Sequence, residues 1–188
     1  MRLFAWMALA ASLFALGGCY FDNPLTGGSS KEINTWLLGV WEHRDEKGRV
    51  ARAQVTPISD DRYFVAFARP GKTSRDVKNY EFEAWPSRVG DTVFLTLKCL
   101  SSPGDIPTGA HVFVQAQLLD QNNARLRGLQ IDLPPTASSF ELRREVRRKL
   151  KDRSLYPAES TDWKRVAEVF WSTDGQDPAF TPIRNPTY

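Results

Sequence analysis

The sequence predicts a mainly β fold of the α+β class, an antiparallel meander of about seven strands that forms a barrel or half-barrel. Two observations carry this prediction. Short runs of alternating apolar and polar residues follow one another from residue 40 to residue 133, each bounded by turn-forming residues. No helical pattern separates these runs, and sequential strands without intervening helices favour an antiparallel sheet.

The expected strands are separated by turn signals such as Asp45-Glu-Lys-Gly48. They cover residues 40–44, 50–57, 63–69, 78–85, 92–100, 111–119 and 124–133. Gly128 lies where the pattern of the last strand changes phase, which indicates a bulge. A period of two predicts one common core face, formed by Tyr63, Val65, Phe67, Tyr80, Phe82, Val93, Leu95, Leu97, Val112, Val114 and Leu118.

Helices are expected before the first strand and after the last strand in the sequence. Ser29, three residues before Glu32, predicts a short helix over residues 31–38. Ser138, three residues before Glu141, predicts a helix over residues 140–151. A second C-terminal helix is expected after residue 157, with Trp163, Val166, Ala167 and Phe170 on one stripe.

The two C-terminal helices are expected to pack on the barrel and cover the apolar residues of its outer face, which are Phe64, Trp85, Phe94 and Phe113. Residues 31–172 then form a single domain, followed by an irregular tail over residues 173–188 that contains three prolines and no periodicity.

The composition excludes several function classes. Lys and Arg total 25 against 22 Asp and Glu, so the net charge of +3 does not indicate a duplex-binding protein. With 2 His and 2 Cys, a zinc cluster built from these residues is excluded. The catalytic motifs of serine hydrolases, zinc proteases and dithiol oxidoreductases are absent from the sequence. We therefore expect no enzyme, metal, cofactor or nucleic-acid partner.

Isolated reactive side chains do not change that expectation. His43 and His111 lie on separate expected strands, and Glu81 and Glu83 fit the alternating charges of a solvent-facing strand surface. Cys99 alternates with Val93, Leu95 and Leu97, which predicts a small buried apolar side chain.

The pattern of the N-terminal residues predicts a targeting signal. Arg2 precedes an apolar stretch over residues 3–16, too short to span a membrane and typical of a secretion signal. The sequence Leu16-Gly17-Gly18-Cys19 that follows resembles the lipobox of bacterial lipoprotein precursors. The resemblance implies cleavage between Gly18 and Cys19, removal of residues 1–18, a diacylglycerol thioether on Cys19, and a further acyl chain such as palmitate.

A lipid on Cys19 would attach the protein permanently to a membrane of the bacterial cell envelope. Tyr20 follows where an aspartate would signal inner-membrane retention, so in a cell with two membranes we expect the outer membrane, facing the periplasm. The Gly/Ser-rich composition of residues 19–30 predicts a flexible tether.

Seven cations lie between Arg143 and Arg153. Two interpretations stay open: contact with anionic headgroups or an acidic partner, or a solvated helix face with Glu145 paired to Arg148 or Lys149.

At the first strand, Gly39-Val40-Trp41 resembles the Gly-x-Trp signature of lipocalins, antiparallel barrels that hold apolar ligands. The resemblance implies that Trp41 closes one barrel end beneath an arginine of the last strand, Arg125 or Arg127. Candidate ligand-lining residues are Tyr63, Phe67, Tyr80, Phe82 and Val114.

Two functions remain open: a binding module for a small apolar or amphipathic ligand, and a structural or interaction lipoprotein that engages envelope proteins. A ligand cup is expected to leave a cavity of about 300 Å³ or more, whereas a structural protein has its interior filled by side chains.

Overall fold

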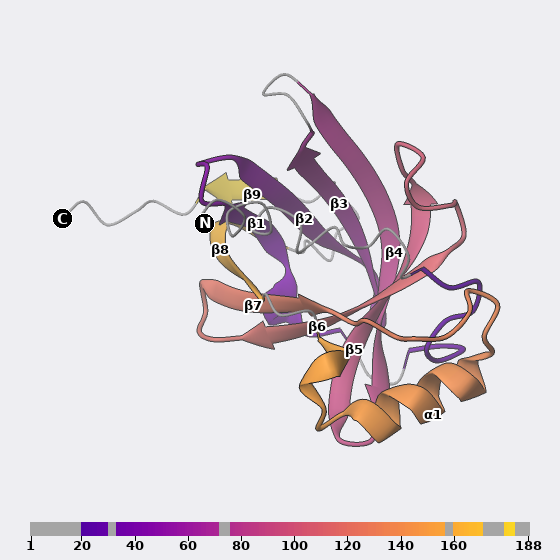
Figure 1. Ribbon diagram of the computed structural model, residues 1–188. Coiled ribbons are helices and arrows are strands. Elements are labelled where there is room, and N and C mark those ends of the chain that lie inside the picture. Colours follow the sequence, from indigo (N-terminus) through magenta and orange to yellow (C-terminus); the bar gives the residue numbers. More distant parts are fainter. Residues whose placement is uncertain (1–19, 30–32, 72–75, 157–159, 171–178, 183–188) are drawn as a thin grey trace, which may run out of the picture.

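The computed structural model describes residues 20–29, 33–71, 76–156, 160–170 and 179–182 (Figure 1). The predicted signal sequence, its cleavage site at Gly18 and the lipidation site Cys19 lie outside the described residues.

Eight antiparallel strands form a closed barrel (Figure 1). Each strand pairs with the next along the chain, and pairing of the first with the eighth closes the ring. The predicted antiparallel β-barrel is therefore confirmed, with one strand more than expected. The strands are β1 (Gly39–Arg44), β2 (Val50–Ser59), β3 (Arg62–Pro70), β4 (Val77–Val89), β5 (Thr92–Ser101), β6 (His111–Leu118), β7 (Asn123–Gly128) and β8 (Thr161–Phe170).

The additional strand is β8, which corrects the prediction of a second C-terminal helix. Apolar residues of this segment fall at helical spacing, but its first half also alternates. Thr161, Trp163 and Arg165 are buried, while Asp162 and Lys164 are exposed. Without β8, β1 and β7 would be edge strands, each with a row of backbone groups open to pairing with another chain. β8 supplies hydrogen bonds to both edges.

Other elements also differ from prediction. The short helix before the barrel is a single 3-10 turn, η1 (Thr35–Leu37), whose N-cap is Asn34. β7 ends at Gly128 and does not continue to residue 133, because the chain leaves the barrel there and buries Leu129 and Ile131 outside it. In the expected tail, β9 (Ala179–Pro182) pairs with β8, and the rest of that tail lies outside the described residues.

A second core lies on the outside of the barrel, as the apolar outer face predicts. Helix α1 (Ser139–Lys149) begins with a full capping box between Ser138 and Glu141, and buries Leu142 and Val146. After α1, a 3-10 turn, η2 (Arg153–Leu155), adds the buried Leu155. The outer core contains Phe21, Leu25, Val89, Phe94, Phe113, Leu129, Ile131, Ala137, Leu142, Val146 and Leu155.

The N-terminal segment over residues 20–29 is docked on this outer face beside α1, so the prediction of a flexible tether is wrong there (Figure 1). Phe21 exchanges two backbone hydrogen bonds with His111, at 2.9 and 2.7 Å. Leu25 is fully buried. The Thr26 hydroxyl bonds to that of Ser87, at 2.8 Å. The Gly/Ser composition predicted a coil, but Phe21 and Leu25, which precede the Gly/Ser residues, are buried and anchor the segment.

Candidate ligand-binding cavity

The barrel encloses an apolar cavity of about 140 Å³. Every strand of the barrel contributes to its wall, because alternate residues of each strand point inward. The lining residues are Leu37, Trp41, Ala53, Val55, Tyr63, Val65, Phe67, Tyr80, Phe82, Leu95, Leu97, Ile106, Val112, Val114, Ala116, Ala124, Leu126 and Trp163.

All five residues predicted to line a ligand site, Tyr63, Phe67, Tyr80, Phe82 and Val114, lie in this wall. Aromatic rings form much of one side. The ring centroids of Phe67 and Tyr80 are 5.7 Å apart, and those of Tyr80 and Phe82 are 6.3 Å apart. Trp163 completes the group at 6.1 Å from Phe67. Sequence reasoning missed Trp163 because its segment was assigned to a helix.

The polar atoms carried by lining side chains are all satisfied within the protein. The Trp41 indole donates to the carbonyl of Leu37 at 2.9 Å, and the Trp163 indole donates to the Thr161 hydroxyl at 3.0 Å. The hydroxyls of Tyr63 and Tyr80 also have partners, described below. A group inside the cavity therefore meets carbon and not a free side-chain donor or acceptor, so the cavity selects for apolar groups.

One end of the barrel is closed by η1 and Trp41. The Tyr63 hydroxyl accepts a hydrogen bond from the backbone N–H of Asn34 at 2.5 Å. Burial raises the pKa of Tyr63 to about 12, although this hydrogen bond acts in the opposite direction. Tyr63 is therefore neutral at physiological pH and acts as a fixed strut between β3 and the segment that closes this end.

The arginine that packs on Trp41 is Arg165 and not Arg125 or Arg127. The Arg165 guanidinium carbon lies 4.9 Å from the ring centroid of Trp41, and Arg165 donates to the carbonyl of Trp36. Arg125 instead pairs with Asp162 at 2.7 Å, and Arg127 lies over the Tyr156 ring. The signal for Arg165 was present in the alternation of β8, which the helical interpretation of the segment concealed.

Position 39, two residues before Trp41, requires glycine for two physical reasons. Its φ is +137°, a conformation that side chains disfavour. A Cβ atom at this position would also lie 2.7 Å from the Ala167 carbonyl oxygen. The glycine thus allows β1 to approach β8 closely where the barrel closes.

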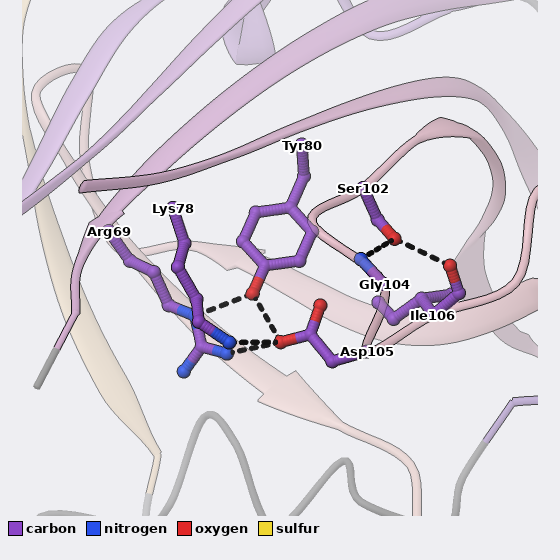
Figure 2. Close-up of polar contacts among 7 residues, drawn as sticks. All are labelled: Arg69, Lys78, Tyr80, Ser102, Gly104, Asp105 and Ile106. Atoms are coloured by element: carbon purple, nitrogen blue, oxygen red, sulfur yellow. Dashed lines mark hydrogen bonds and ion pairs between the residues drawn. The ribbon is translucent and has the colours of Figure 1, made fainter. Parts of the chain in front are cut away.

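The other end is covered by the β5–β6 loop over residues 102–110, whose Ile106 side chain is buried in the wall of the cavity. The Ile106 carbonyl accepts a hydrogen bond from the Ser102 hydroxyl at 2.6 Å. Next to it, Asp105 contacts Arg69, Lys78 and the Tyr80 hydroxyl (Figure 2). These polar residues lie at the boundary between the apolar cavity and solvent, because Tyr80 is buried while the Asp105 side chain is about one-third exposed.

The remaining reactive side chains do not gather around the cavity. Cys99 is fully buried, as predicted, and burial raises the pKa of its thiol. His111 is buried between strands and the N-terminal segment, with Nδ1 at 3.3 Å from the Phe21 carbonyl, and burial lowers its pKa. His43 Nδ1 lies 2.9 Å from the carbonyl of Asp162. Among the described residues, no three His, Cys, Asp or Glu side chains are grouped to hold a metal ion.

The basic helix has internal partners for part of its charge. Glu145 contacts Arg148 at 2.6 Å and Lys149 at 3.1 Å. Side-chain hydrogen bonds from Arg148 and Lys149 outweigh the opposing effect of burial and hold the pKa of Glu145 below its usual value. These ion pairs are the ones expected for a solvated helix face. In that interpretation Leu142 and Val146 pack against the barrel, and the cations of α1 face solvent.

Comparison of the chain with protein-family models, curated proteins and solved structures finds no match. Among the described residues, no helix has the length and apolar character needed to cross a membrane.

Proposed function

We propose that this chain is a lipid-anchored protein of the bacterial cell envelope whose barrel binds a small apolar or amphipathic ligand without catalysing a reaction. The observation that carries the binding proposal is the cavity whose lining side chains offer no free polar atom. The proposal of a lipid on Cys19, and of the outer membrane where there are two membranes, rests on the resemblance of Leu16-Gly17-Gly18-Cys19 to a lipobox. The resemblance to lipocalins supports the same class of function.

The volume of the cavity restricts the size of the ligand. At about 140 Å³ it is smaller than the roughly 300 to 1,000 Å³ of pockets for drug-sized molecules. It is close to the roughly 150 Å³ of an engineered apolar cavity that takes up benzene. The enclosed group is therefore a single ring or a short alkyl chain, unless the ends of the barrel move.

The same volume favours a second candidate function. A barrel whose interior is largely filled by Trp41, Phe67, Tyr80 and Trp163 resembles a structural module more than a wide cup. In that alternative the protein engages envelope proteins through its surface, and the cavity is a packing defect.

Mass spectrometry of the mature protein purified from its host distinguishes these functions. We expect a stoichiometric small molecule, released by organic solvent, and an N-terminal peptide in which Cys19 carries diacylglycerol and an acyl chain such as palmitate. An empty barrel that takes up no apolar probe would contradict the binding proposal, and an unmodified Cys19 in the mature chain would contradict the anchor. The protein should retain residues 20–29, since Phe21 and Leu25 belong to the outer core.

A substitution that fills the cavity tests whether an apolar probe binds inside the barrel. Ala116→Leu adds three carbons to a lining position of β6. We expect the affinity for an apolar probe to fall by about tenfold or more, which corresponds to about 1.4 kcal/mol. Ala66→Leu is the control, because Ala66 alternates with the lining residues Val65 and Phe67 and points outward. Equal probe affinity for the two variants would show that the probe does not bind in the barrel.

A further inference from the structure

A cluster of polar side chains, Arg69, Lys78, Tyr80 and Asp105, lies at the end of the barrel that the β5–β6 loop covers. Three donors converge on one oxygen of Asp105, its Oδ2 (Figure 2). Arg69 Nη2 lies at 2.8 Å, Lys78 Nζ at 3.1 Å and the Tyr80 hydroxyl at 2.7 Å. Arg69 Nε also donates to the Tyr80 hydroxyl at 2.8 Å. Two cations and a hydroxyl thus meet one carboxylate oxygen.

The chemistry of this donor set suits an anion. A planar guanidinium, an ammonium and a phenol form strong hydrogen bonds with a carboxylate, because charged partners shorten and strengthen the bond. Burial would raise the pKa of Asp105, but hydrogen bonds from Tyr80 and Lys78 outweigh burial and lower it. Burial, aided by Asp105, raises the pKa of Tyr80 to about 12, so this hydroxyl keeps its proton for donation.

The donor set is continuous with the apolar cavity. The Tyr80 ring lines the cavity and its hydroxyl belongs to the cluster, so a single side chain connects the two environments. On the loop side, Asp105 precedes Ile106, whose side chain lies in the cavity wall. The dipeptide therefore places a carboxylate on the cations and a branched alkyl group in the wall of the cavity, and these are the two chemical parts of a small amphiphilic carboxylate.

We propose that the ligand of this barrel is a single-chain amphiphile with an anionic head, and that Asp105 and Ile106 occupy its place in the structure described here. The head binds Arg69, Lys78 and Tyr80, and the alkyl chain enters the cavity. Binding displaces Asp105 from the donors and Ile106 from the wall, which enlarges the space for the chain. This inference rests on the proposed ligand-binding function and adds to it the charge of the ligand and the site of its head.

Equilibrium dialysis with octanoate and octanol tests the inference on the full chain held in nanodiscs, with empty nanodiscs subtracted. The two probes have the same chain length, and at pH 7 only octanoate is charged. Partition into lipid is the same for all variants, so the ratio of the two affinities compares variants directly. Octyl phosphate, in a third arm, distinguishes a phosphate head from a carboxylate head.

Asp105→Asn keeps the shape of the side chain and removes its charge. We expect the preference for octanoate over octanol to rise about tenfold, because the internal competitor loses a charge-assisted interaction. Arg69→Gln and Tyr80→Phe are expected to lower that preference about tenfold, because each removes a hydrogen-bond donor to the anionic head. Tyr80→Phe keeps the ring in the cavity wall, so it remains informative if another variant is unstable.

Asp162→Asn is the matched control, because it removes a carboxylate from an exposed ion pair with Arg125 on the barrel surface. Its preference should equal that of the unsubstituted protein. Binding of both probes with a preference that none of the cluster variants alters would overturn the inference and leave the proposed function intact. Binding of neither probe by any variant would overturn the proposed function as well.

Discussion

Phe21→Ala is expected to lower the free energy of unfolding by about 3 to 5 kcal/mol, the range for phenylalanine removed from a packed core. The residue is 1% exposed, and its ring stacks on that of Phe113 with centroids 5.6 Å apart. The substitution leaves a void between the barrel and α1 that neighbouring side chains cannot fill without moving. Urea denaturation followed by circular dichroism measures the change.

Phe140→Ala is the control, since Phe140 lies on α1 with 64% of its surface exposed. Its ring has an arginine nearby, Arg144, with the guanidinium 5.9 Å from the ring centroid. We expect a loss below about 1 kcal/mol. If Phe21→Ala costs no more than this control, residues 20–29 do not dock and the composition-based prediction of a tether is correct.

The docked N-terminal segment also takes part in a chain of hydrogen-bonded hydroxyls on the outer face of the barrel. The hydroxyls of Thr26, Ser87 and Thr96 form a continuous chain, with distances of 2.8 and 2.7 Å. Ser87 and Thr96 are fully buried, so each hydroxyl depends on the next for a partner. Phe21, Leu25 and Thr26 therefore contribute to both the apolar and the polar packing on β4 and β5.

The barrel could be predicted from the sequence because its signal is local. In β3, for example, Tyr63, Val65 and Phe67 alternate with other residues, and this period of two is a property of consecutive residues. The same periodicity identified the aromatic wall of the cavity. Cys99 was assigned correctly for the same reason, because its burial follows from its place in that alternation.

The errors have a common cause, since each depends on a partner distant in the sequence. The segment around Trp163 and Val166 satisfies both helical and strand spacing, and the edges of β1 and β7 decide between them. The cover of the cavity depends on Asp105, which finds Arg69 and Lys78 on two other strands. A single sequence contains the side chains of such contacts without the distances between them.

The second substitution expected to have a large effect on stability removes Arg165, which lies at the closed end of the barrel. This arginine is 8% exposed and interacts with two parts of the closed end, the Trp41 ring and the Trp36 carbonyl. A desolvated cation on an aromatic ring contributes up to about 2 kcal/mol. A hydrogen bond from a charged donor contributes about 1.5 to 3 kcal/mol. Since such contributions are not fully additive, Arg165→Ala is expected to lower the free energy of unfolding by about 2 to 4 kcal/mol.

Two further variants test whether the loss of stability comes from the contacts of Arg165 at the closed end of the barrel. Arg165→Lys keeps the charge but not the planar group that stacks on an indole, so we expect an intermediate loss of stability. Arg125→Ala removes an arginine of β7 whose partner, Asp162, is largely exposed, and exposed ion pairs contribute little. Near-ultraviolet circular dichroism should report the change at Trp41 for the Arg165 variants alone. If Arg125→Ala destabilises the protein as much as Arg165→Ala, the closing role does not belong to Arg165, because burial and stacking on Trp41 are what distinguish the two arginines.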